Sequence, residues 1–182
     1  MIICAGNQES FSFATTIGVG LIDSAINLTK ICLMQVPEYL IFIGSCGSYG
    51  KLKPFDIVTS STSSNIELSF LQDLSYTPID NVVKAQNSIS SFFVSHETII
   101  NSSNYITTDE KLSKQMLDYN IDCENMEFFS VVKVAREFNI PVVGVFVVTN
   151  YCNKNAHEDF KQNHSKAMQI LVNFLHEKSI IK

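Results

Sequence analysis

One run of residues, 140–148, constrains the fold of this chain more than any other. It reads IPVVGVFVV, nearly all apolar and mostly β-branched, which predicts a strand buried on both faces, as in parallel sheets covered by helices. Apolar residues recur at helical spacing over residues 126–138, so an amphipathic helix precedes the strand, and Pro141 stops that helix from continuing. The run ends in Thr149 and Asn150. Polar residues at the carboxyl end of a central strand mark the edge where open α/β sheets bind ligands.

Strands and helices alternate along most of the remaining chain. Apolar and β-branched runs predict strands at 1–5, 39–43, 54–59, 81–85, 92–94 and 98–100, with a β-prone stretch at 11–20. Apolar residues at helical spacing, or a capping box, predict helices at 21–35, 107–119 and 155–177. The polar stretch 60–65 is expected to be a loop, and 66–74 fits either a strand or a helix. This order predicts an α/β fold with one domain spanning residues 1–182.

Composition narrows the class of protein. The 182 residues, 46% hydrophobic and 17% charged, suffice for a globular domain with a sizeable core, and no apolar run reaches the roughly 20 residues of a membrane span. The start has neither a basic region nor a long apolar run, so no signal peptide is expected. Five scattered cysteines without a CxxC pair indicate reduced thiols in a cytoplasmic protein, and no metal site.

The charge pattern limits the ligands. The net charge is −5, the lysines are dispersed, and Arg136, in the middle of a predicted helix, is the only arginine in the sequence. Nucleic acid needs a clustered basic surface, and highly charged phosphates usually recruit arginine, so the composition favours neither. A neutral small molecule is the easier ligand to accommodate.

Three motifs are candidates for ligand binding, and each also has a purely structural explanation. Residues 44–50, GSCGSYG, follow a buried strand with small residues whose backbone can approach a ligand closely; a loop packed under a helix is an equal alternative. Tyr105 lies in a polar loop where it can stack on a flat ligand, although a half-buried tyrosine is the more ordinary explanation. Glu124 and Glu127 stand at a helix start, a position that favours carboxylates in any case.

Other motifs carry little weight. The sequence GVG at 18–20 lacks the third glycine of a dinucleotide-binding loop, so a tight turn between strand and helix is the preferred interpretation, and no cofactor is expected. His96, His157 and His164 have no partner pattern and are interpreted as surface or core histidines.

Together, three short motifs resemble one family. GSCG at 44–47, NME at 125–127 and VVTN at 147–150 occur in the order, spacing and elements of the purine nucleoside phosphorylase and nucleosidase superfamily, and the resemblance runs from about Thr16 to Leu175. It implies a three-layer α/β/α fold with a central mixed, mostly parallel sheet. It also implies a purine nucleoside as ligand and a homo-oligomer, with a dimer favoured.

The resemblance assigns roles on the sugar side and on the base side of a nucleoside. Glu127 would accept hydrogen bonds from the sugar hydroxyls, as an ionised carboxylate can. Asn150 would hydrogen-bond the purine near N7. Ser45 and Gly47 would line the ribosyl and nucleophile side, Tyr105 and Ile106 would pack against the purine, and Met126 would lie under the sugar. Asn125 also belongs to the substrate-binding residues that the resemblance implies.

The chain departs from the family at the phosphate site. Bacterial phosphorylases that resemble it at GSCG carry an arginine three residues before the serine, where this chain has Phe42. We therefore expect hydrolysis, with Glu9 as the candidate general base that activates water. Phosphorolysis, with phosphate held at an atypical site by a histidine, a lysine or a neighbouring subunit, is the alternative. The chain is also shorter than its relatives before the turn at 18–20, and Glu9 loses this role if the first strand is what is absent.

The chain also departs from part of the family at residue 150. The similar nucleosidases for 5′-methylthioadenosine and S-adenosylhomocysteine carry an aspartate there, which protonates adenine. An amide cannot act as that acid, but its NH₂ group can donate to N7 and to a 6-oxo group. Asn150 therefore predicts a 6-oxopurine such as hypoxanthine as the leaving base, from an inosine-like or futalosine-like nucleoside. A nucleoside-binding protein without catalysis is the alternative from another class.

Overall fold

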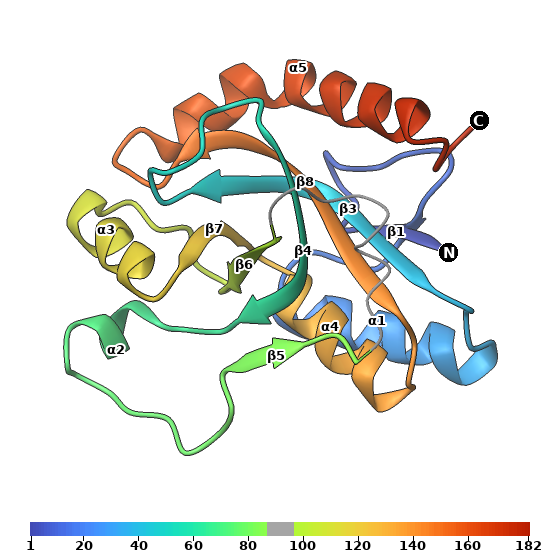
Figure 1. Ribbon diagram of the computed structural model, residues 1–182, viewed down its shortest axis with the longest axis horizontal. Coiled ribbons are helices and arrows are strands. Elements are labelled where there is room, and N and C mark those ends of the chain that lie inside the picture. The colour runs from blue at the N-terminus through green and yellow to red at the C-terminus, as the bar shows by residue number, and fades with distance from the viewer. Residues whose placement is uncertain (87–96) are drawn as a thin grey trace.

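The computed structural model describes residues 1–86 and 97–182 (Figure 1). Its strands are β1 (Ile2–Cys4), β2 (Thr15–Thr16), β3 (Leu40–Ser48), β4 (Ile57–Ser64), β5 (Val82–Lys84), β6 (Glu97–Ser102), β7 (Ile121–Asn125) and β8 (Val142–Tyr151). Its helices are α1 (Leu21–Met34), α2 (Leu68–Leu71), α3 (Glu110–Asp118), α4 (Phe128–Glu137) and α5 (Ala156–Glu177). The strand predicted at 92–94 and His96 lie outside the described residues. None of the described helices is long and apolar enough to cross a membrane.

Helices cover both faces of one sheet, which confirms the predicted α/β/α layers. Helix α5 lies over one face, where Leu171 belongs to the same apolar cluster as Val145 of β8 (Figure 1). Helices α1 and α4 lie on the opposite face, where the ring of Phe128 packs edge-on to that of Phe146, 5.2 Å between centroids. Every residue of β8 except Tyr151 is buried, as its apolar sequence predicts.

The strand pairing closes part of the sheet into a ring. Strand β8 runs parallel to β3 and antiparallel to β4, β4 pairs with β6, β6 with β7, and β7 returns to β3. Strands β1 and β2 extend the sheet beyond β3, and β5 extends it beyond β4. Of the eight pairings among the described strands, five are parallel, so the sheet is mixed and mostly parallel, as expected. The parallel pairs are β1 with β2, β1 with β3, β3 with β8, β4 with β6, and β6 with β7.

The polar stretch 60–65 belongs mostly to a strand, and the predicted loop is wrong. Residues 60–64 complete β4, and its hydroxyls bond to the neighbouring strand. Ser60 donates to the Thr98 carbonyl of β6, and Ser63 donates to the Ile100 carbonyl at 2.6 Å. A hydroxyl with a hydrogen-bond partner can be buried at little cost, so this serine-rich segment can form a buried strand of the ring despite its polarity.

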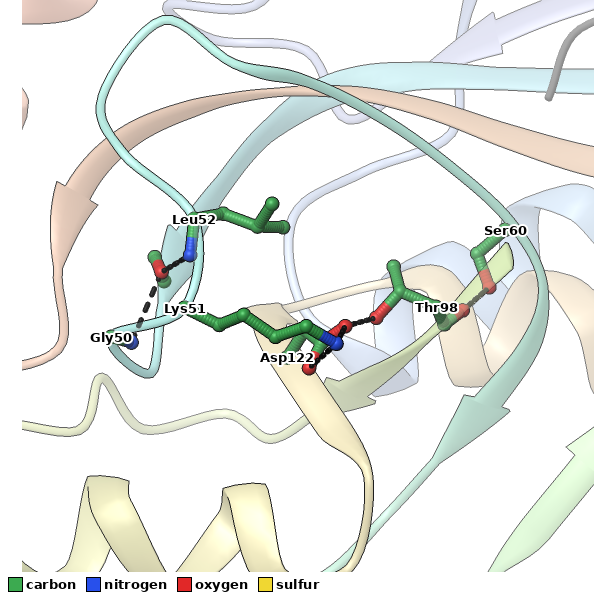
Figure 2. A network of polar contacts seen from close by, with 7 residues as sticks. Gly50, Lys51, Leu52, Ser60, Thr98 and Asp122 are labelled. Carbon is green, nitrogen blue, oxygen red and sulfur yellow. Dashed lines mark hydrogen bonds and ion pairs between the residues drawn. The ribbon is translucent and has the colours of Figure 1, made fainter. Parts of the chain in front are cut away.

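A second polar network ties the β3–β4 connection to the ring (Figure 2). Lys51 lies 3.0 Å from a carboxylate oxygen of Asp122 on β7, and the hydroxyl of Thr98 on β6 donates to the same oxygen at 2.6 Å. The hydroxyl of Ser48 accepts from two backbone N–H groups of the turn that follows β3. The contacts of Asp122 and Ser48 hold the turn after β3 beside the amino end of β7, which runs antiparallel to β3.

Several element boundaries differ from the prediction. The strand predicted at 39–43 continues to Ser48, so GSCG lies within β3 and is not a loop. Strand β7 was not predicted, and the ambiguous stretch 66–74 contains the short helix α2. The β-prone stretch 11–20 contributes only β2. The remaining helices lie where the helical spacing places them, within a few residues at each end.

Candidate active site

A cavity of about 350 Å³ lies where β3, β7 and β8 end and where the chain leaves β1. It is large enough for a small organic ligand. Its wall is formed by Ala5, Gly6, Asn7, Gln8, Glu9, Val19, Ser45, Cys46, Ile106, Glu124, Asn125, Met126, Glu127, Thr149, Asn150, Ala156, His157 and Phe160. The structure thus brings together most of the residues that the sequence singles out, although they come from five separate parts of the chain.

Glu9 reaches the cavity from the turn after β1. Its carboxylate accepts hydrogen bonds from the Ser45 N–H, 3.1 and 3.2 Å from the two oxygens, and from the Ser45 hydroxyl. Gly44 makes this approach possible, because a Cβ atom at that position would lie 2.6 Å from Oε2 of Glu9. Burial raises the pKa of Glu9, and the bonds from Ser45 and the nearby His164 partly oppose that rise. A first strand is present before Glu9, because β1 pairs with β3. The alternative in which the chain lacks this strand therefore does not apply, and the role of Glu9 as a general base stays a prediction.

Glu127 is the residue directly before α4, and it is 3% exposed. Its Oε1 accepts a 2.8 Å hydrogen bond from the N–H of Gly20. Gly20 has a φ of 85°, a conformation that favours glycine, so the predicted tight turn delivers this donor. Burial, with the nearby charge of Glu9 as a smaller cause, raises the pKa of Glu127 to about 7, against the bond from Gly20.

The side chain of Asn125 connects two parts of the site by hydrogen bonds. Its Oδ1 accepts from the N–H groups of Glu127 and Phe128, both at 2.9 Å, which satisfies two free donors at the start of α4. Its Nδ2 donates to the Ser45 carbonyl at 3.1 Å. The side chain of Asn125 therefore positions Glu127 and Ser45. Met126, the next residue in the chain, is part of the cavity wall.

Asn150 is held by its neighbours on β8. Its Oδ1 accepts from the Thr149 hydroxyl at 2.8 Å, and its Nδ2 donates to the Tyr151 carbonyl at 3.1 Å. One N–H of the amide is left for a ligand. Gly47 is not part of the cavity wall, but it leaves space for this amide, because a Cβ atom at Gly47 would lie 3.1 Å from Nδ2.

The two residues expected to pack against a purine lie differently relative to the cavity. Ile106 is part of the cavity wall. The side chain of Tyr105 is 78% exposed and lies outside the wall, so its contact with a ligand stays a prediction.

Glu124 is not the helix-start charge that its position before α4 suggested. It lies on β7 and is 8% exposed, and its carboxylate accepts from the Tyr49 hydroxyl and from the N–H and hydroxyl of Thr107. Since β7 itself was missed, the sequence offered no signal for this arrangement.

Two residues of α5 were also missed as parts of the site. Phe160 and His157 belong to the cavity wall, and the Phe160 ring lies 5.0 Å from that of His164. The three-to-four-residue spacing places them on one face of the helix. The sequence does not show which face of α5 lies toward the cavity, so these residues could not be assigned to the site before the packing of α5 was known.

The ionisable side chains of the cavity wall are mostly acidic. Glu9, Glu124 and Glu127 line it together with His157, and neither a lysine nor an arginine of the described chain does so. Phe42, three residues before Ser45, is fully buried in the core, and Arg136 is exposed at the end of α4. Within residues 1–86 and 97–182, no three histidine, cysteine or acidic side chains are grouped to hold a metal ion.

Known proteins share this fold. A family model described as the phosphorylase superfamily matches residues 8–177. No curated protein sequence matches the chain. A mutant of the 5′-methylthioadenosine/S-adenosylhomocysteine nucleosidase of Helicobacter pylori, solved with 5′-methylthioadenosine in its active site, superposes with a TM-score of 0.80 at 16% identity, over 98% of this chain and 96% of that one.

Two further solved structures are similar. Futalosine hydrolase of Helicobacter pylori has a TM-score of 0.79 at 17% identity, over 98% of this chain and 95% of that one. The 5′-methylthioadenosine/S-adenosylhomocysteine nucleosidase of Neisseria meningitidis, in complex with methylthio-immucillin-A, has a TM-score of 0.75 at 15% identity, over 98% and 96%. At such identities the likeness shows a common fold.

Proposed function

Because the chain belongs to the phosphorylase superfamily, we propose that it cleaves the N-glycosidic bond of a purine nucleoside by hydrolysis. The observation that carries this proposal is the charge of the cavity wall, which holds three glutamates and, among the described residues, no lysine or arginine. A phosphate dianion would meet repulsion there, whereas water would not. The structural neighbours, which are nucleosidases and a futalosine hydrolase, favour hydrolysis too, by analogy of fold.

The sugar side of the site supplies a base and a hydroxyl acceptor. Glu9, oriented by Ser45, would take a proton from the attacking water, and the burial that raises its pKa makes its carboxylate a stronger base. Glu127, oriented by Gly20, would accept hydrogen bonds from the ribosyl hydroxyls. Negative charge near the sugar also stabilises the oxocarbenium-like transition state.

The base side would assist departure of the purine. Nδ2 of Asn150 would donate to N7 or to a 6-oxo group, where negative charge develops as the bond breaks. An amide has no proton to transfer to adenine, so the preferred leaving base would be a 6-oxopurine such as hypoxanthine, from an inosine-like or futalosine-like substrate.

One assay tests the reaction type. Purified protein is incubated with inosine, guanosine, futalosine, adenosine and 5′-methylthioadenosine, with and without phosphate, and the released base and sugar are quantified. We expect hypoxanthine and free ribose from inosine, at a rate that phosphate does not change. Base release that requires phosphate and gives ribose 1-phosphate would replace hydrolysis by phosphorolysis. Binding without release from any substrate would indicate a non-catalytic nucleoside-binding protein.

We also place the protein in the cytoplasm as a homo-oligomer, with a dimer favoured. All five cysteines are free and buried, which suits a reducing compartment. Helix α1 exposes Ile22, Ile26 and Leu33 at helical spacing, and apolar residues repeated on one exposed face are typical of an interface.

A further inference from the structure

The segment 103–109, between β6 and α3, forms part of the cavity wall through a single residue, Ile106. Residues 104–106 and 108–109 are exposed, with Tyr105 78% and Ile106 52% accessible. Thr107, between them, is only 3% exposed. The segment therefore runs over the surface and turns inward at one point, directly after the residue that faces the cavity.

Thr107 is held at that point by a buried carboxylate. Its N–H donates to Oε1 of Glu124 at 2.9 Å, and its hydroxyl donates to Oε2 at 2.6 Å. The Tyr49 hydroxyl donates to the same Oε2 at 2.9 Å and fixes the carboxylate from β3. Hydrogen bonds to an ionised group are stronger than neutral ones, so three of them give the segment a firm attachment.

The other end of the segment is attached to the turn that binds Glu127. Oδ1 of Asn104 accepts from the N–H of Leu21 at 2.9 Å. Gly20 leaves room for this contact, because a Cβ atom there would lie 2.9 Å from Oδ1 of Asn104. Tyr105 and Ile106 are therefore the only two residues between the two attachment points.

We propose that Glu124 is a positioning residue, which holds Ile106 against the bound ligand by binding Thr107. The inference rests on the proposed function for the identity of that ligand, the base of a purine nucleoside. Glu127 and Glu124 then have similar roles. Each carboxylate lies at the cavity and accepts a hydrogen bond from the backbone of one connection: Glu127 from the 18–20 turn and Glu124 from the 103–109 segment. Glu124 would act on substrate affinity rather than on the chemical step.

The test compares three threonine variants. Thr107→Val keeps the shape but removes the hydroxyl donor, and we expect KM for inosine to rise about tenfold, the effect of one charge-assisted hydrogen bond, with kcat within about twofold of the wild type. Thr107→Ser keeps the donor and should restore the wild-type KM. Thr108→Val makes the same chemical change at the exposed neighbouring residue and should leave both constants unchanged. An unchanged KM in Thr107→Val, or a loss confined to kcat, overturns the proposal.

Hydrogen exchange on the wild-type protein tests the attachment without any variant and without turnover. The Thr107 amide should exchange at least about tenfold more slowly than the amides of Tyr105 and Ile106, because it alone donates to a buried carboxylate. Equal rates across the segment overturn the proposal even if the variants fail to fold. If the wild type releases no base, the proposed function fails, while protection at Thr107 with weaker inosine binding by Thr107→Val in calorimetry still supports the role of Glu124.

Discussion

At the scale of single residues, we propose that Asn150 sets which base the site prefers. Replacing it with aspartate supplies an acid that can protonate adenine at N7 and removes the NH₂ donor to a 6-oxo group. We expect the ratio of kcat/KM for 5′-methylthioadenosine to that for inosine to rise by at least tenfold. Asn153→Asp makes the same change of charge outside the cavity wall and should leave the ratio unchanged. A ratio that does not move in Asn150→Asp would remove the argument for a 6-oxopurine.

Glu127 is expected to give the proposed reaction a pH dependence near neutrality. Its folded-state pKa is about 7, against an ordinary value of 4.5, and only the ionised form accepts two sugar hydroxyls. We expect kcat/KM to rise with pH through about 7. Glu127→Gln keeps an acceptor for the Gly20 N–H but cannot ionise, so its residual activity should lack this rise. A wild-type profile that is flat from pH 6 to 8 would contradict the assignment.

The same pKa has a consequence for stability, with the opposite sign. The folded state binds the proton of Glu127 more tightly than the unfolded state does. The contribution of Glu127 to the free energy of unfolding therefore falls as pH rises from about 4.5 to about 7 and is constant above that. Activity and stability should change in opposite directions over the upper part of this interval, as is common for functional groups that are buried for chemistry.

At the scale of elements, the Asp122 network should matter more than its exposed ion pair suggests (Figure 2). Asp122→Ala leaves the buried Thr98 hydroxyl without its acceptor, so we expect a loss of about 2 kcal/mol in the free energy of unfolding by urea denaturation. Lys51→Ala removes only a side chain that is 65% exposed and should cost less than about 1 kcal/mol. Equal costs for the two variants would show that the ion pair, not the Thr98 bond, is what stabilises the region.

The elements that sequence reasoning predicted are those with a strong local pattern. The apolar run of β8 and the helical spacing of α1, α4 and α5 were sufficient to place them. Strand β4 was misread because its serines bond to carbonyls of β6, a strand some 37 residues away, and no local pattern reports that contact. Strand β7, IDCEN, was missed because it is short and contains two acidic residues whose partners, Lys51 and Thr107 among them, come from elsewhere.

At the scale of the whole molecule, the ring of strands explains why the site could be predicted only in part. Ser45, Glu127 and Asn150 each stand in a motif that resembles a family, so their meeting at one cavity could be expected. Glu124 stands in no such motif. It reaches the cavity because β7 pairs with both β3 and β6, where Gly47 faces Glu124 on one side and Asn101 does on the other. That pairing is a property of the closed ring rather than of any segment within it.

The proposed dimer is testable at the same scale. Ile22 and Ile26 are 66% and 48% exposed on α1, and Val19, in the turn that precedes α1, belongs to the cavity wall. An interface on this face would therefore cover apolar surface beside the ligand site. We expect the wild-type protein to sediment at twice the chain mass of 20.4 kDa, and the double variant Ile22→Glu/Ile26→Glu to sediment at the mass of one chain, since charges buried in an apolar interface oppose association.

Ile79→Glu places a charge on an apolar residue that is equally exposed but lies between α2 and β5, and it should remain dimeric. Because the α1 face adjoins the cavity, the monomeric variant should also show a higher KM for inosine while Ile79→Glu does not; a double variant that keeps the wild-type mass would place the interface elsewhere.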